Sequence, residues 1–75
     1  MRKLYEIAGD IRRDWRKVNF GAMPYLEAMS SLETVEDAYY HDSAKSIIAY
    51  FLVNSGSWKG ETARAIKSEL KSMIK

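Results

Sequence analysis

The sequence contains no cysteine, and it has one proline and one histidine among its 75 residues. Without cysteine, disulfide bonds and thiolate zinc sites are excluded. A chain of this length buries only about 60% of the surface that its unfolded form exposes, so its margin of stability is small. Its stability must therefore come from well-packed helices, from association with a partner, or from both.

Long apolar runs are also lacking. The longest, Ile47–Val53, is far shorter than the roughly 20 residues that cross a bilayer. The N-terminus carries the charges of Arg2 and Lys3 but no apolar stretch of the kind found in a secretion signal. We therefore expect a cytoplasmic protein that does not associate with membranes.

Recognisable catalytic and metal-binding patterns are missing as well. Metal sites need several converging ligands, whereas the potential ligands near His41 in the sequence are only Asp37 and Asp42. The serines follow no nucleophile pattern, and Gly56 and Gly60 are too close together for a phosphate-binding loop. We expect a non-enzymatic protein with no catalytic residues, no cofactor and no metal.

Helical periodicity is the main signal that is present. Apolar residues recur at steps of three and four over residues 3–18, which predicts a first helix from about Lys3 to Val18. A second, short helix is expected to begin at Pro24 and to end near Leu32. Gly9 lies inside the first pattern, where glycine is unfavourable, and it suggests a close helix contact. Asp10 and Arg13, and likewise Asp14 and Lys17, are three residues apart and can form ion pairs on the exposed face.

Residues 42–74 predict a C-terminal helical hairpin. Asp42 or Ser43 can cap its first helix, and the run Ile47–Val53 predicts a helix in the middle of the bundle, with Ile48 and Phe51 in the core. Gly56 is expected to end that helix in a left-handed conformation, and Trp58 to seal the end of the hairpin. The fold class is therefore all-α: residues 1–75 form a single domain, a small bundle of three to four helices.

Residues 33–41 are not assigned by the pattern. Thr34 and Asp37 have the spacing of a capping box that opens another helical turn, but the segment also reads as an acidic loop. Both alternatives remain open at this point.

Charge is distributed unevenly, although the net charge is only +2. Residues 1–20 hold six basic and three acidic groups, residues 21–44 hold five acidic groups and no Lys or Arg, and residues 45–75 hold six basic and two acidic groups. Helices of opposite sign that pack together would account for this pattern.

Two groups of residues are candidates for a protein-binding surface. A domain this small is not expected to bury all nine of its aromatic rings, and exposed rings in a cluster suggest a binding face. The candidates are Arg12, Arg13, Arg16 and Lys17 in the first helix, and Tyr39, Tyr40 and His41 before the hairpin. A solvated helix face and a solvent-facing loop histidine are the simpler alternatives. Self-association as a homodimer would also cover surplus apolar surface.

Nucleic-acid binding is the alternative function. It would use the basic faces of the first and last helices, with Arg64, Lys67 and Lys71 on the last. The turn between residues 54 and 60 is long for a helix-turn-helix motif, and Glu61 and Glu69 interrupt the basic face. The simpler alternative is an antiparallel hairpin whose basic face, including Lys67 and Lys71, is solvated.

The chain resembles small uncharacterised proteins of temperate phages and prophages of Gram-positive bacteria. The resemblance is carried by DSAKSIIAYFLVNSGSWKGETARAIKSELK at residues 42–71 and by MRKLYEIAGDIRRDW at residues 1–15. It implies a phage accessory protein in the cytoplasm of a bacterial host cell. Such a protein would bind and modulate a host or defence protein, in the sharpest case as an inhibitor, or would assist phage DNA metabolism.

Overall fold

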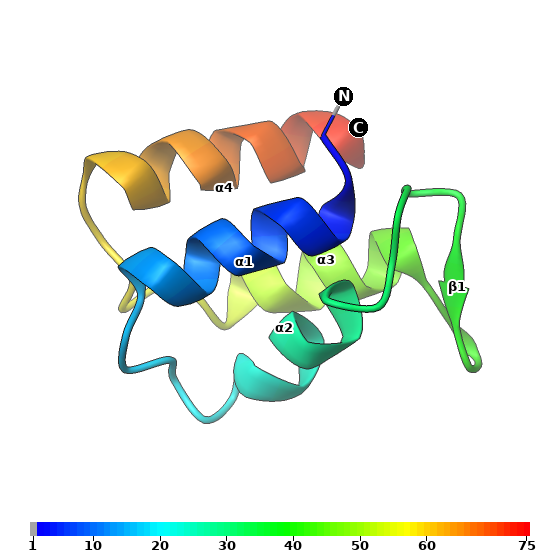
Figure 1. Ribbon diagram of the computed structural model, residues 1–75, viewed down its shortest axis with the longest axis horizontal. Helices are drawn as coiled ribbons and strands as arrows, with labels where there is room; N and C mark the ends of the chain where they lie inside the picture. Colours follow the sequence, from blue (N-terminus) through cyan, green and yellow to red (C-terminus); the bar gives the residue numbers. More distant parts are fainter. Residues whose placement is uncertain (1) are drawn as a thin grey trace.

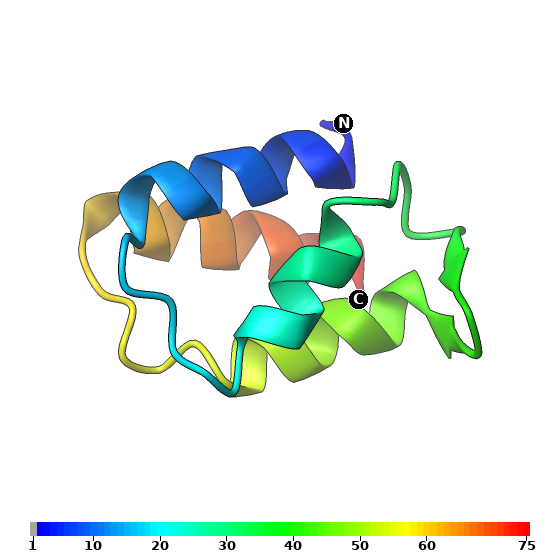
Figure 2. The same cartoon turned by 60° about the horizontal axis from the view of Figure 1, so that its bottom comes forward.

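The computed structural model describes residues 2–75 and contains four helices and two short strands. They are α1 (Leu4–Asp14), α2 (Met23–Met29), β1 (Ala38–Tyr39), β2 (Asp42–Ser43), α3 (Ala44–Val53) and α4 (Glu61–Met73). α1 and α4 lie side by side and run in opposite directions (Figure 1). α2 packs against both α1 and α3, and α3 also contacts α4 (Figure 2). The mainly helical fold predicted from apolar spacing is confirmed.

The prediction of a purely helical chain is wrong at residues 38–43. β1 and β2 pair antiparallel, with Ala38 opposite Ser43 and Tyr39 opposite Asp42. A ladder of this length is not stable by itself in water. It is anchored to the bundle because the Ala44 N–H, at the start of α3, donates to the Asp37 carbonyl oxygen at 2.9 Å.

The segment before the strands is a hydrogen-bonded loop, which settles the alternatives for residues 33–41. The Asp37 carboxylate accepts the backbone N–H groups of Glu33 and Thr34, at 2.8 and 3.2 Å. The Thr34 hydroxyl accepts the N–H of Glu36 at 3.2 Å. Side chains thus accept these backbone N–H groups in a single turn, and residues 33–37 contain no helix.

The first helix is shorter than expected. It begins at Leu4 and ends at Asp14, where the sequence pattern predicted Lys3 to Val18. Trp15 leaves the helical conformation, with φ −97° and ψ 82°, and its side chain turns into the core at 7% exposure. The apolar spacing extends past the end of the helix because Trp15 and Val18, although they are not helical, also pack against the core.

The C-terminal hairpin forms as predicted, with one correction. Ser43 caps α3, since its hydroxyl accepts the Ser46 N–H at 3.1 Å. Gly56, however, does not adopt a left-handed conformation. The positive φ belongs to Gly60, at 114°, immediately before α4.

One cluster of buried side chains joins the four helices. Its largest fully buried members are Leu4, Ile7, Ile11, Leu26, Met29, Ile47, Ile48, Phe51 and Leu70. α3 contributes Ile48 and Phe51 as predicted, but the other helices do not surround it. Tyr50 and Val53 on its outer side are 51% and 80% exposed, so the expectation of a fully central helix is wrong.

Candidate interaction surface

The structure separates the seven residues singled out from the sequence. The basic segment consists of Arg12, Arg13, Arg16 and Lys17, in the last turn of α1 and the loop after it. The hairpin tip consists of Tyr39, Tyr40 and His41, at the turn between β1 and β2. The C-terminal end of α1 and the β-hairpin lie at opposite ends of the long axis, which extends 29 Å (Figures 1 and 2). The two groups therefore do not form one surface.

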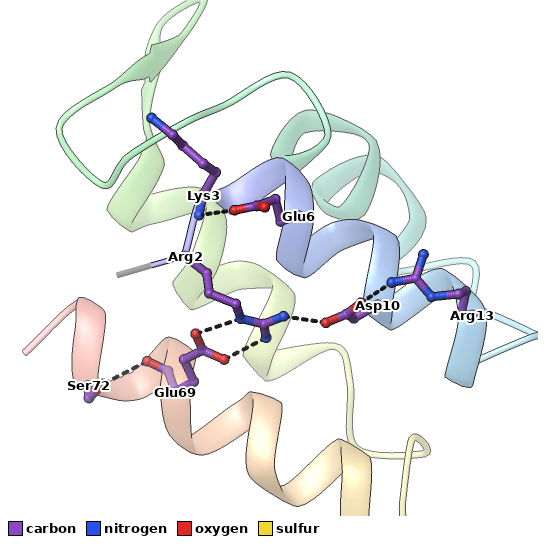
Figure 3. Close-up of polar contacts among 7 residues, drawn as sticks. All are labelled: Arg2, Lys3, Glu6, Asp10, Arg13, Glu69 and Ser72. Carbon is purple, nitrogen blue, oxygen red and sulfur yellow. Dashed lines mark hydrogen bonds and ion pairs between the residues drawn. The ribbon is translucent and has the colours of Figure 1, made fainter.

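The basic segment is partly neutralised by ion pairs. Arg13 pairs with Asp10, as its spacing in the sequence predicted, and Asp10 also pairs with Arg2 (Figure 3). Arg2 reaches across to α4 and donates two hydrogen bonds to the Glu69 carboxylate, at 2.8 and 3.1 Å. The guanidinium of Arg2, together with that of Arg13, keeps the pKa of the Asp10 carboxyl below its ordinary value. Of the basic segment, this leaves Arg12, Arg16 and Lys17 without an ion pair in residues 2–75.

The expected packing of helices with opposite charge was compared with the observed ion pairs. Lys3 and Glu33, at 3.1 Å, join the first basic segment to the acidic segment. The Arg2–Glu69 pair instead joins the two basic segments to each other. Helices of opposite sign therefore do not account for the charge pattern.

The expected pair between Asp14 and Lys17 is replaced by a contact that the spacing could not reveal. The Asp14 carboxylate accepts the indole N–H of Trp58 at 2.8 Å. Trp58 stacks on Trp15, with ring centroids 5.6 Å apart, and both rings meet Phe51 edge to face. Trp58 thus seals the hairpin end as predicted. Because both indoles are buried, neither offers a face for stacking on a nucleobase.

The hairpin tip is exposed at Tyr40 and His41, whereas Tyr39 is half-buried against the core, and the backbone is strained at Tyr40. Tyr40 is 86% exposed and has a φ of 56°, a left-handed conformation that is unfavourable for a bulky residue. Its ring meets that of Tyr39 edge to face at 4.7 Å. His41 is exposed beside it. The tip presents an aromatic ring to solvent, in line with the expected partial exposure of the aromatic residues.

A further surface was not identified from the sequence. We call it the apolar patch, and we define it as the exposed side chains of Phe20 and Val53 together with the packed rings of Tyr25 and Tyr50. Phe20 is 92% exposed, and the rings of Tyr25 and Tyr50 pack together with centroids 5.5 Å apart. The available signal was that Tyr50 and Val53 lie three residues apart on one side of a helix, away from the side that buries Ile48 and Phe51.

Asn54 holds the parts of the apolar patch in place. Its backbone carbonyl accepts the Asn19 side-chain N–H at 3.2 Å, and its own side chain donates to the Tyr50 carbonyl at 2.8 Å. Gly21 lies against the same side chain, so closely that a β-carbon there would come within 2.9 Å of the Asn54 oxygen. The loop that carries Phe20 is thereby fixed against the end of α3.

Metal-binding clusters and membrane-spanning helices were also sought in the described residues. Among residues 2–75, no three histidine, aspartate or glutamate side chains are grouped so as to hold a metal ion. In the same part of the chain, no helix combines the length and the apolar character needed to cross a membrane. Comparison of the chain with protein families, curated proteins and solved structures gives no match.

Proposed function

We propose that the chain is a small non-enzymatic interaction module that binds a partner protein through the apolar patch. The observation that carries this proposal is the exposure of Phe20 and Val53, at 92% and 80%, in a chain whose other Leu, Ile, Val, Phe and Trp side chains are buried or half-buried. Burial of one such side chain contributes about 1.5–3 kcal/mol. Part of that gain is spent on association itself, but exposed aromatic residues on a fixed scaffold are typical anchors of protein interfaces.

The charges beside the apolar patch favour an acidic partner. Arg16 and Lys17 precede Phe20 by four and three residues, and both are exposed. Neither forms an ion pair in the described residues. A partner with an apolar centre and carboxylates at its rim would match this surface, because complementary charges guide association and penalise wrong partners.

A second copy of the chain is a poorer match for the same reason. A two-fold dimer places the same surface of each subunit against the other. The cations of Arg16 and Lys17 would then be brought towards their own copies. We therefore expect a monomer in isolation and a complex with a different protein.

The resemblance to phage proteins suggests which protein this is. We propose a host or defence protein in the bacterial cytoplasm whose activity is modulated, in the sharpest form inhibited, by the bound chain. An inhibitor of this kind acts by binding its target and blocking it sterically, so it needs no catalytic groups of its own.

The test combines capture from a bacterial lysate with direct binding to the purified captured protein. Phe20→Ser and Val53→Ser are expected to weaken the affinity of the purified pair by at least about tenfold each, since each removes an apolar anchor. Tyr40→Ser is the matched control, because Tyr40 is equally exposed but lies at the opposite end of the molecule. If Tyr40→Ser alone weakened binding, the binding site would be the hairpin tip and the patch assignment would be wrong.

Sedimentation of the isolated chain tests the choice of partner. We expect a monomer at tens of micromolar protein. A dimer that Phe20→Ser dissociates would show that a second copy occupies the apolar patch, contrary to the proposal.

Nucleic-acid binding remains the alternative, and one observation favours it. The C-terminal end of α1 and the start of α4 lie at the same end of the molecule (Figure 1), and the sequence places the basic segment at the first and Arg64 in the first turn of the second. Asp10 and Asp14 lie among them, which weakens the local field. Fluorescence polarisation with DNA and RNA at two salt concentrations tests it. A nanomolar, strongly salt-dependent complex that Arg16→Glu abolishes without loss of fold would favour this alternative.

A further inference from the structure

A basic pocket lies where the α3–α4 connection enters α4. Its volume is about 340 Å³, at the small end of the range for ligand sites. It is lined by Gly56, Trp58, Lys59, Gly60, Ala63, Arg64 and Lys67. Its charged groups are thus two ammonium groups and one guanidinium, and no carboxylate lines it.

The three cations are not paired with a carboxylate in the part of the chain that the structure describes. In residues 2–75, none of Lys59, Arg64 and Lys67 takes part in an ion pair. Glu61, the nearest acidic residue in the sequence, does not neutralise them. Like charges that converge in a pocket repel each other, so an anion bound between them would stabilise the arrangement.

Lys67 is held in the pocket by the fold. Its ammonium donates to the Trp58 carbonyl oxygen at 2.6 Å and lies 5.8 Å from the centre of the Trp58 ring. This hydrogen bond uses one of its three donors and leaves two for a ligand. Contrary to the expectation of a solvated side chain, Lys67 is half-buried. Its pKa lies below its ordinary value, first because burial disfavours the ammonium and then because Lys71 and Lys59 are near.

We propose that this pocket binds a small phosphate-bearing anion, such as inorganic phosphate or pyrophosphate, between Lys59, Arg64 and Lys67. Guanidinium matches two oxygens of a phosphate group at once, and the lysines supply point charges. The fixed position of Lys67 lowers the cost of ordering that side chain on binding. The proposal is independent of the apolar patch, which involves none of these residues.

The test is titration with pyrophosphate at constant ionic strength, followed by the backbone amide signals of Lys59 and Gly60 in ¹H–¹⁵N spectra. Lys67→Gln is the main variant, because a glutamine amide can still donate to the Trp58 carbonyl while the charge is lost. Arg64→Gln is the second variant, and it alters an exposed side chain with no hydrogen bond in the described structure. Each is expected to weaken binding about tenfold, the usual effect of one lost charge-assisted hydrogen bond.

Lys45→Gln is the matched control, since it removes the same charge from an exposed position on α3. It is expected to change the affinity by less than about twofold, whereas a general effect of net charge would be equal in all three variants. An equal effect, or no saturable shift at Lys59 and Gly60, would overturn the proposal. A single-stranded oligonucleotide that moved the same signals at a lower phosphate concentration than pyrophosphate would also overturn it, in favour of a nucleic-acid site.

Discussion

Two glycines of the α3–α4 connection differ in backbone conformation rather than in available space. A β-carbon would meet no atom within 4 Å at either Gly56 or Gly60. Gly60, however, has φ 114° and ψ 179°, a region that is essentially restricted to glycine. Gly60→Ala is therefore expected to lower the free energy of unfolding by about 1–3 kcal/mol.

Gly56→Ala is the control for this prediction, because Gly56 does not have a positive φ. We expect it to leave the stability unchanged or slightly raised, since alanine restricts the unfolded chain more than glycine does. Chemical denaturation of both variants measures the difference. Equal effects of the two substitutions would contradict the conformational argument.

Tyr40 shows how a residue can be tolerated without contributing to stability. Its left-handed φ costs about 1–2 kcal/mol, and the edge-to-face contact with Tyr39 returns about 0.5–1.5 kcal/mol. These amounts nearly cancel. Stability therefore gives no reason for an exposed aromatic residue at this position, and the hairpin tip is a reasonable second place to examine for partner contacts.

At the level of elements, α1 contains a glycine with no structural requirement. The close helix contact expected at Gly9 is absent, since a β-carbon there would meet only the end of the Arg13 side chain at 3.7 Å. Gly9→Ala is expected to raise the free energy of unfolding by about 1 kcal/mol, the difference in helix propensity. The melting temperature should rise by roughly 4–8 °C. Gly21→Ala is the contrasting variant, and it should destabilise the chain because its β-carbon would collide with Asn54.

α3 connects the core to the proposed binding surface. Phe51 is fully buried and meets Trp15 and Trp58. Phe51→Ala is expected to cost about 3–5 kcal/mol. The total stability of a chain this size is on the order of 4–11 kcal/mol, so this variant should be largely or wholly unfolded at elevated temperature.

Tyr50→Ala is the matched control in the adjacent position, where the side chain is 51% exposed. It should cost much less stability than Phe51→Ala, and thermal unfolding followed by circular dichroism compares the two. If Phe51→Ala melted like the parent chain, the assignment of Phe51 to the centre of the core would be wrong.

Spacing in the sequence revealed the helices because each buries one face, and helical periodicity is a local property. It placed Ile48, Phe51 and Trp15 in the core and offered Asp42 or Ser43 as the cap of α3, of which the structure shows Ser43. It could not reveal the end of α1 at Trp15, because stacking of Trp15 on Trp58 depends on residues 43 positions apart. For the same reason, the spacing predicted an ion pair of Asp14 with Lys17 and not the hydrogen bond from the Trp58 indole.

The candidate surfaces were harder to foresee for a related reason. The basic segment and the hairpin tip can be recognised in the sequence as a basic run and an aromatic run. Their separation to opposite ends of the molecule depends on the tertiary structure. The apolar patch joins Phe20, from a loop that broke the helical pattern, to the outer side of α3. The contacts of Asn54 with Asn19 and Gly21, which are distant in the sequence, help to bring these segments together.

For the whole molecule, the ion pairs and the Asp37 loop make stability depend on pH. The pKa of Asp37 is lowered, first by the hydrogen bond from the Glu33 N–H and then by that from the Thr34 N–H. The pKa of Asp10 is lowered by Arg2 first, and also by Arg13. A carboxyl whose pKa is lower in the folded state stabilises the fold fully above its unfolded pKa, about 3.9 for Asp. That contribution is lost as the pH falls through the folded pKa.

The free energy of unfolding should therefore be nearly constant from pH 7 to about pH 5 and should fall below about pH 4.

Asp37→Asn is expected to be less stable than the parent chain at pH 7, because the amide accepts the two backbone N–H groups more weakly than the carboxylate. The difference should shrink on acidification, since the parent carboxyl is then protonated. Glu36→Gln, which removes a charge from the neighbouring exposed residue, measures the effect of net charge alone. Denaturant unfolding of the three chains between pH 2.5 and pH 7 gives the comparison. A constant difference between the parent chain and Asp37→Asn over this range would show that the carboxylate does not hold the loop through its charge.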